Sequence, residues 1–137
     1  MGALKIESIF CEDIRLEATQ KHILIGVFSD EVLVHTTPAN IGIALWLRIH
    51  GIAVGKHKIH IEAYLESGDE RKLCGEISAD LEVLRPGRAT VINSPTLVIP
   101  VEKDGMLKYF ISFDDEPPQD AGTLIVTVVA PNSKLVL

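Results

Sequence analysis

Apolar and polar residues alternate along most of the chain, and apolar stripes with the period of a helix are not sustained. The clearest case is the segment 41–50, IGIALWLRIH, whose odd positions are all isoleucine or leucine. In the segment 57–66, HKIHIEAYLE, the apolar residues again fall at odd positions from Ile59 onward. A period of two places such side chains on one face of a strand. We therefore predict that the two segments form a β-hairpin over a common core, joined by GIAVGK at 51–56.

Seven further segments show strand patterns, which gives about nine strands in all. They are LKIESIF at 4–10 with a continuation to Glu17, HILIGVF at 22–28, EVLVH at 31–35, ISADLEVL at 77–84, TLVIPV at 96–101, MLKYFISF at 106–113 and GTLIVTVV at 122–129. Turn residues such as Ser67-Gly68-Asp69 separate them. Short strands at intervals near 8–12 residues predict an all-β fold, an antiparallel, immunoglobulin-like β-sandwich formed by residues 1–137 as one domain. The segments 22–28 and 122–129 are apolar on both faces, which favours a central strand or an interface.

Residues 12–21, EDIRLEATQK, allow two interpretations. A short helix could begin at Asp13 as its N-cap, because good helix formers follow it. The apolar even positions from Leu4 to Leu16 instead keep one period-two phase, which favours a long or bulged strand. We therefore predict that the first strand continues to Glu17.

The stretch 10–17, FCEDIRLE, is the densest group of charges in these strands. On a strand, Arg15 lies between Asp13 and Glu17 on one face, and such exposed ion pairs contribute about 0–1 kcal/mol each. Glu12 falls on the opposite, apolar face. Either a bulge turns its carboxylate out to water, or the carboxylate is partly desolvated and functional. Glu12 is therefore the candidate functional carboxylate.

The outer face of the predicted hairpin carries the residue types that dominate protein contacts, since tryptophan, tyrosine and arginine are common in binding hot spots. The predicted interaction face consists of Trp46, Arg48, His50, His60, Glu62 and Tyr64. Pairing across the hairpin would place Trp46 opposite or next to His60 and Glu62. The expected partner is another protein or a second copy of the chain in a homodimer. The alternative is that a neighbouring segment covers Trp46.

The composition of the chain counts against several classes of function. The 13 lysines and arginines against 19 acidic residues give a net charge of −6, which counts against nucleic-acid and anionic membrane binding. The chain has no apolar run of the ~20 residues that a membrane helix needs, and its first ten residues lack the core of a secretory signal. We expect a cytoplasmic location, with Cys11 and Cys74 reduced.

The sequence contains few residue patterns that are typical of catalytic or metal-binding sites. The acidic residues of the predicted loops form one group at each end of the sandwich: Asp69, Glu70, Glu102 and Asp104, and Asp114, Asp115, Glu116 and Asp120. Neither group supplies the six to eight converging oxygens of a calcium site. The five histidines lack zinc-site spacing, and no G-x-S-x-G, phosphate-loop or H-E-x-x-H motif occurs. We predict a non-catalytic interaction or subunit module without metal or cofactor. The alternative is a sandwich that binds carbohydrate or calcium, with an enzyme as the third choice.

The N-terminal third resembles an uncharacterised family of small bacterial proteins. In that family a strand precedes a Cys-acid-acid-Ile-Arg-x-Glu stretch, a lysine and a Leu-Ile-Gly-aromatic strand. The matching residues here are Cys11, Glu12, Asp13, Ile14, Arg15, Glu17, Lys21 and 24–28, LIGVF. The chain departs from the family at 18–21, ATQK, where a glycine is expected before the lysine. The resemblance implies a β-sandwich and a bacterial origin, and it transfers no catalytic residue.

Overall fold

The computed structural model describes residues 3–129, which form nine strands and no helix. The strands are β1 (Lys5–Leu16), β2 (His22–Val27), β3 (Glu31–Val34), β4 (Ala39–His50), β5 (Gly55–Ser67), β6 (Glu70–Val83), β7 (Thr90–Val101), β8 (Gly105–Phe113) and β9 (Gln119–Val128). Each segment predicted as a strand overlaps one of these strands, which confirms the all-β class. In this part of the chain, accordingly, no helix is suited to crossing a membrane.

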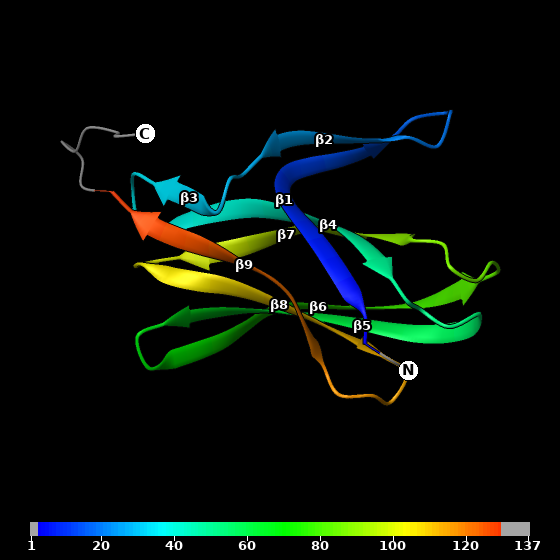
Figure 1. Ribbon diagram of the computed structural model, residues 1–137. Helices are drawn as coiled ribbons and strands as arrows, with labels where there is room; N and C mark the ends of the chain where they lie inside the picture. The colour runs from blue at the N-terminus through cyan, green and yellow to red at the C-terminus, as the bar shows by residue number, and fades with distance from the viewer. Residues whose placement is uncertain (1–2, 130–137) are drawn as a thin grey trace.

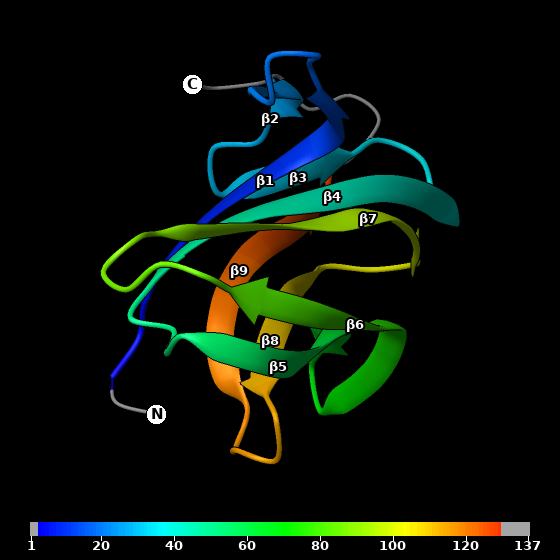
Figure 2. The same cartoon turned by 90° about the vertical axis from the view of Figure 1, so that its right-hand side faces the viewer.

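The strands form two sheets that pack as a sandwich (Figures 1 and 2). One sheet has the order β2-β1-β4-β7, and the other has the order β3-β9-β8-β5-β6. The strand pairs are antiparallel except for β3 and β9, which are parallel. The parallel pair arises because β3 follows β2 into the other sheet and aligns there with the last strand. The backbone N–H of Ile125 donates to the carbonyl of Asp30 at this crossing, at 2.8 Å.

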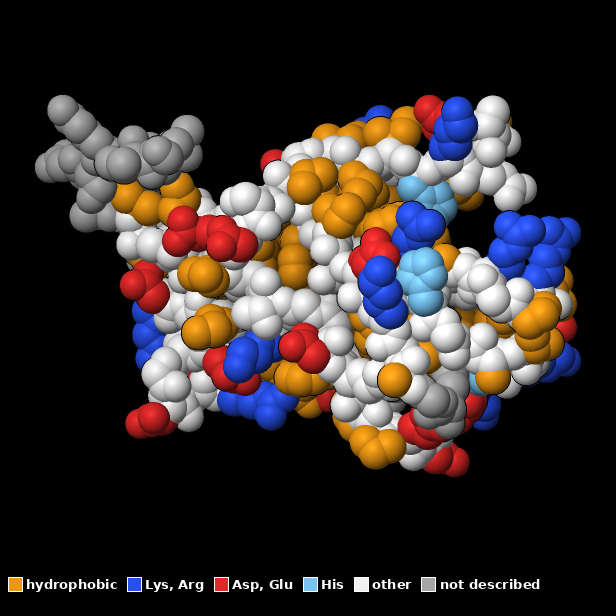
Figure 3. Space-filling model, viewed as in Figure 1, with side chains coloured by type: hydrophobic (Ala, Val, Ile, Leu, Met, Phe, Trp, Pro, Cys, Tyr) orange, Lys and Arg blue, Asp and Glu red, His pale blue; other side chains and the backbone are white. Residues whose placement is uncertain are grey.

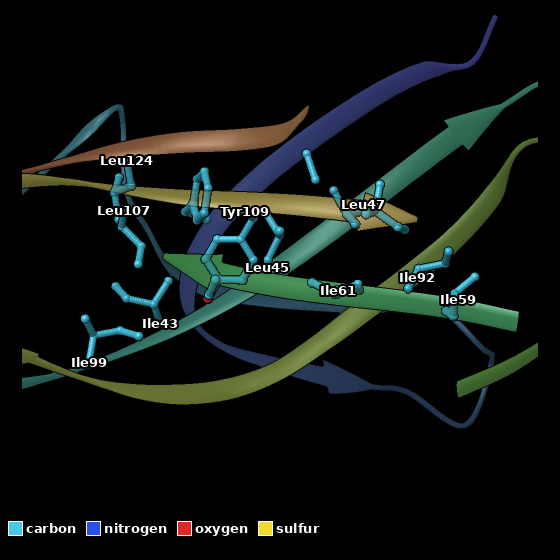
Figure 4. Packing of buried hydrophobic residues seen from close by; sticks show 14 of the residues in the cluster. Ile43, Leu45, Leu47, Ile59, Ile61, Ile92, Ile99, Leu107, Tyr109 and Leu124 are labelled. Carbon is cyan, nitrogen blue, oxygen red and sulfur yellow. The ribbon is translucent and has the colours of Figure 1, made fainter. Parts of the chain in front are cut away.

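The core is built from the alternation that the sequence displays. The odd positions of β4 from Ile43 to Ile49 are completely buried, and those of β5 from Ile59 to Ala63 are buried as well. Figure 4 shows Ile43, Leu45, Leu47, Ile59 and Ile61 between the two sheets, together with residues of β7, β8 and β9. Full burial of one such aliphatic side chain contributes about 1.5–3 kcal/mol. The predicted inward faces of both segments are therefore confirmed.

The predicted hairpin between 41–50 and 57–66 is wrong. β4 pairs with β1 and β7, whereas β5 pairs with β6 and β8. The connection between β4 and β5 carries the chain from one sheet to the other, so the two strands face each other across the core. Both arrangements bury the same odd positions, because a period of two identifies the buried face of a strand and not its neighbours.

β1 pairs with two different strands along its length. Its residues Lys5 to Cys11 pair with β4, and its residues Cys11 to Leu16 pair with β2. The strand bends between these parts, so that its second half and β2 form a hairpin that we call the arm, residues 11–27 (Figure 1). The arm contains strand up to Leu16, and the alternative of a helix over 12–21 is therefore wrong.

The turn of the arm is formed by the segment 18–21, ATQK, at which the chain departs from the family resemblance. Gln20 has φ +67°, in the left-handed region that glycine adopts at the lowest cost. It directly precedes Lys21, at the position where the resemblance places a glycine. The N–H of Gln20 donates to the carbonyl of Glu17 at 2.8 Å, which closes the turn.

The two segments that are apolar on both faces have different surroundings. β9 lies between β3 and β8, so a central strand is confirmed for 122–129, but its outer face is not covered, because Ile125 is exposed. β2 lies at the edge of its sheet, so a central strand is wrong for 22–28. Its apolar character has no explanation in the interior of the sandwich.

Tyr109 offers a test of the core. Its ring is fully buried and packs edge-on against Phe10, with ring centroids 5.5 Å apart. Among the residues that the structure describes, its hydroxyl has no hydrogen-bond partner, and burial raises the pKa of this hydroxyl. An unsatisfied buried hydroxyl costs about 1–3 kcal/mol.

We expect Tyr109→Phe to raise the free energy of unfolding by about 1 kcal/mol, because it removes this hydroxyl and keeps the ring. Denaturant unfolding measures the change. Tyr64→Phe is the control, because the Tyr64 hydroxyl donates to Glu62 and its removal should not stabilise the protein. A less stable Tyr109→Phe variant would contradict the assignment of an unsatisfied group.

Candidate functional site

The predicted interaction face is divided between the outer faces of the two sheets. Trp46, Arg48 and His50 lie on β4, whereas His60, Glu62 and Tyr64 lie on β5. The structure does not place Trp46 beside His60 or Glu62, because the hairpin on which that expectation rested does not form. Two separate surfaces result, one on β4 and one on β5.

The β4 surface is partly covered by the arm. Trp46 is half-buried, and its indole N–H donates to Nδ1 of His22 at the start of β2, at 3.0 Å. His50 lies 3.4 Å from the carboxylate of Glu7 on β1, while Arg48 is exposed. The alternative that a neighbouring segment covers Trp46 thus describes the structure. The tryptophan side chain serves to anchor the arm.

A hollow of about 460 Å³ remains beneath the arm. It is lined by Gln20, Lys21, His22, Leu24, Trp46 and Val91. Figure 3 shows the notch between the tip of the arm and the rest of the molecule, at the upper right. The arm is therefore joined at its base to the first half of β1, and Trp46 holds it at His22. Open space remains beneath its turn.

The outward side of the arm carries the apolar residues of β2. Ile23, Ile25 and Val27 are exposed there, beside Arg15 and Asp13 of β1, whereas the exposed Leu16 lies opposite His22 on the other side of the arm. β2 itself is an edge strand. Hydrophobic side chains gather over β1 and β2 along the top of the molecule in Figure 3. Exposed apolar side chains that gather on one element mark binding surfaces more often than isolated ones do.

Glu12, the candidate functional carboxylate, is exposed and lies against the other strand of the arm. The pairing of β1 with β2 keeps one register but skips Glu12 and Gly26. Gly26 has φ +65°, and a Cβ atom there would lie 2.5 Å from Oε1 of Glu12. The irregularity thus belongs to Gly26 and is not an inserted residue in β1. The Glu12 side chain occupies the space that the missing Gly26 side chain leaves.

The neighbouring charges form only part of the expected ladder. Nε of Arg15 lies 3.2 Å from Oδ2 of Asp13, while the carboxylate of Glu17 accepts from the Thr19 hydroxyl at 3.1 Å. Cys11, at the bend of β1, is fully buried. Burial raises the pKa of its thiol, and the nearby Asp13 carboxylate acts in the same direction. Cys11 and Cys74 are both free thiols.

The β5 surface brings together a cluster of polar side chains. Nε2 of His60 lies 3.1 Å from Oε1 of Glu62 and 3.3 Å from Oε2 of Glu76. Nδ1 of His60 lies 2.8 Å from the hydroxyl of Ser78, and the hydroxyl of Tyr64 donates to the second oxygen of Glu62. In the described part of the chain this is the one place where three metal-ligating side chains of the His, Cys, Asp or Glu type converge. Neither acidic loop group does so.

Sequence reasoning found three members of this cluster and missed Glu76 and Ser78. Both belong to β6, which begins at Glu70, whereas the sequence pattern predicted a strand only from Ile77 and so left Glu76 outside it. Ser78 lies within the predicted strand, but the pairing of this strand with β5 was not predicted. The turn at 67–69 was a usable signal, because a tight hairpin there places the residues after it opposite β5. The turn pairs Ser67 with Glu70, and a register shift between Ala63 and Tyr64, which the turn does not reveal, then pairs Glu62 with Glu76 and His60 with Ser78.

An aromatic and basic strip continues from the cluster toward the turn of that hairpin. The guanidinium of Arg71 lies 4.0 Å from the centre of the Tyr64 ring and 5.3 Å from the centre of the Phe110 ring. Arg71 and Lys108 both pair with the carboxylate of Glu66, at 3.6 and 3.1 Å. Arg71 and Lys108 thus have their own carboxylate partner, which is not a member of the cluster.

A second polar constellation lies at the end of the sandwich where β4 passes to β5. Nδ1 of His57 lies 2.9 Å from Oδ2 of Asp114, and its Nε2 lies 2.7 Å from the carbonyl of Ala53. The hydrogen bond to Asp114 raises the pKa of His57, and the Ala53 carbonyl adds to the effect. The same bond, with the N–H of Lys58, lowers the pKa of Asp114. The pair borders an open groove of about 640 Å³.

We expect Gly26→Ala to lower the free energy of unfolding by about 1–2 kcal/mol through the left-handed backbone alone. The approach of the new methyl group to Glu12 should add to this loss. Gly87→Ala is the control, because Gly87 has φ +71° and open space around it. Denaturant unfolding of both variants, and of Gly26→Ala with Glu12→Ala, separates the two contributions. Equal losses at Gly26 and Gly87 would show that Glu12 does not press on Gly26.

The His57–Asp114 pair predicts a pH dependence of stability. The raised pKa of His57 contributes stability that is complete below its unfolded value of about 6.5 and is lost as pH rises through the folded value. The lowered pKa of Asp114 contributes stability that is complete above about 3.9 and is lost as pH falls through the folded value.

Asp114→Asn should therefore destabilise the protein most between about pH 4 and pH 6.5, and less on either side. Melting temperatures across this range, with Asp115→Asn as the control for loss of one loop charge, measure the effect. A loss that is independent of pH would contradict the ion pair.

Comparison with known proteins adds a family and no activity. A search of curated proteins finds no match to the chain. A family model matches residues 7–126, from β1 into β9, which includes the arm and the β5 cluster. The chain therefore belongs to DUF6941, a family of unknown function.

Proposed function

We propose that the protein is a non-catalytic interaction module that binds a second copy of itself through the edge of β2. The observation that carries the proposal is the exposure of an apolar edge strand. Ile23, Ile25 and Val27 of this strand are 41%, 39% and 57% exposed. Among residues 3–129, β2 has β1 as its single neighbour in the sheet.

Edge strands of globular proteins are usually protected against pairing. Charged side chains, proline and bulges are the common devices. β2, HILIGV, contains no lysine, arginine, acidic residue or proline, and its pairing with β1 is irregular at Gly26, next to its last residue. An edge of this kind is a template to which another strand can add by backbone hydrogen bonds.

A second copy is the partner that the charges favour. A two-fold interface brings the same surface of both chains together, so a charge near the two-fold axis lies close to its own copy. The protein carries a net charge of −6, yet its β2 strand is uncharged. Lys21 precedes β2, and Asp30 follows it. When two β2 strands pair antiparallel, the start of each strand lies next to the end of the other. Lys21 of each chain is thereby brought toward Asp30 of the other chain.

The anchoring of the arm supports the proposal. The hydrogen bond from Trp46 to His22 restrains the arm before any partner binds. A surface that is already ordered loses less conformational entropy on association. Trp46 thus contributes to the contact by holding β2 in place, and it does not lie at the centre of the interface.

The test is the mass of the full chain in solution, measured by light scattering over a range of concentrations. We expect a dimer for the natural sequence and monomers for Ile23→Lys and Val27→Lys. Each substitution introduces one lysine per chain, so the interface would have to bury two like charges. Leu84→Lys is the matched control, since Leu84 is 76% exposed and lies outside the arm. A monomer at every concentration, or dimers of both arm variants, would refute the proposal.

We further propose that the sandwich is immunoglobulin-like and that the protein acts in the cytoplasm. The first proposal is supported by the strand order, because β9-β8-β5-β6 opposite β4-β7 matches the order G-F-C-C′ opposite B-E. The second is supported by the two free cysteines, since thiols persist in reducing compartments.

A further inference from the structure

The cluster on the outer face of β5 and β6 carries an inference that does not depend on the arm. We propose that His60, Glu62 and Glu76 bind a divalent transition-metal ion such as Zn²⁺. The ligands would be Nε2 of His60, Oε1 of Glu62 and Oε2 of Glu76. These three atoms lie within 4.8 Å of one another.

The spacing of the three atoms fits a small metal ion. Zinc bonds to imidazole nitrogen and carboxylate oxygen are about 2.0–2.2 Å long, which places neighbouring ligands of a tetrahedral centre about 3.3–3.6 Å apart. Nε2 of His60 lies 3.1 Å from the Glu62 oxygen and 3.3 Å from the Glu76 oxygen. Binding therefore requires only small side-chain movements.

The ligands stand on strands and not on loops. His60 and Glu62 are two residues apart on β5, so their side chains leave the same face of the sheet. Glu76 is paired with Glu62 on the adjacent strand β6. β5 is held between β6 and β8, which fixes the backbone positions of His60 and Glu62.

Further hydrogen bonds orient the ligands as they do in metal sites. When Nε2 of a histidine binds metal, Nδ1 carries the proton and needs an acceptor. The hydroxyl oxygen of Ser78 lies 2.8 Å from Nδ1 of His60 and can accept it. The oxygen of Glu62 that would not bind metal accepts from the Tyr64 hydroxyl. Two of the three ligands thus have a partner that holds them in a binding orientation.

The charge of the cluster favours a cation. Glu62 and Glu76 are directly opposed across two strands, and like charges in such a pair destabilise a sheet. Within residues 3–129, neither carboxylate pairs with a lysine or arginine, and both contact His60. A divalent ion between them would neutralise this repulsion.

The ligand types indicate which ion. Calcium takes six to eight oxygen ligands, and this cluster supplies one nitrogen and two carboxylates. Imidazole favours zinc and its transition-metal neighbours over calcium and magnesium. Three protein ligands leave a fourth zinc position for water or for a donor from another molecule.

Calorimetric titration of the metal-free full chain with a zinc salt tests the proposal. We expect one zinc ion per chain, and an affinity at least tenfold weaker in Glu76→Gln and in His60→Gln. Glu82→Gln is the matched control, because Glu82 is exposed on the same strand and face, and it should leave the affinity unchanged. Glu76 is itself 55% exposed at its side chain, so its substitution should not disturb folding.

Thermal unfolding supplies a second readout. Zinc should raise the melting temperature of the natural chain and of Glu82→Gln, because a ligand that binds only the folded state stabilises it. The rise should be absent from Glu76→Gln and His60→Gln. Failure of the natural chain to bind zinc, or unchanged binding by these two variants, would refute the site. Ile23→Lys should abolish the proposed dimer and leave the metal site intact. Titration of this variant with zinc therefore tests the metal site independently of the dimer.

Discussion

The structure depends on the burial of one face of β4 against one face of β5 and β8. Ile43, Leu45, Leu47 and Ile49 are excluded from water, and they meet Ile59, Ile61 and Tyr109 across the sandwich. Because alternate side chains of a strand leave opposite faces, this packing assigns every even position of β4 and β5 to the outside. The location of both candidate surfaces follows from that assignment.

β1 introduces the main departure from a regular sandwich. Its first half completes a sheet with β4, and its bend at Cys11 sends the second half away with β2. Cys11 is buried at the bend, and the hydrogen bond between Trp46 and His22 holds the arm in place. An apolar edge strand is thereby displayed instead of being covered. The charged stretch around Glu12 has a structural place in this arrangement, because Glu12 fills the space beside Gly26.

The two proposed sites lie on different sheets and use different physical effects. The arm offers apolar surface and free backbone groups, which suit another strand. The His60–Glu62–Glu76 cluster offers lone pairs and negative charge at short range, which suit a cation. A family without an assigned activity can thus be approached from two independent sites, and neither requires chemistry at the charged stretch that dominates the N-terminal sequence.

Periodicity in the sequence determined the strands, their inward faces and the all-β class, because burial of alternate side chains is a local property of each strand. It also identified His60, Glu62 and Tyr64 as outward residues of one strand. Only the tertiary structure decided which strands are neighbours: it separated Trp46 from His60, covered Trp46 with the arm and placed Glu76 beside Glu62. The physical reason is that an alternating strand buries the same residues whether its partner lies beside it in the sheet or opposite it across the core, so register and sheet order depend on contacts between distant segments.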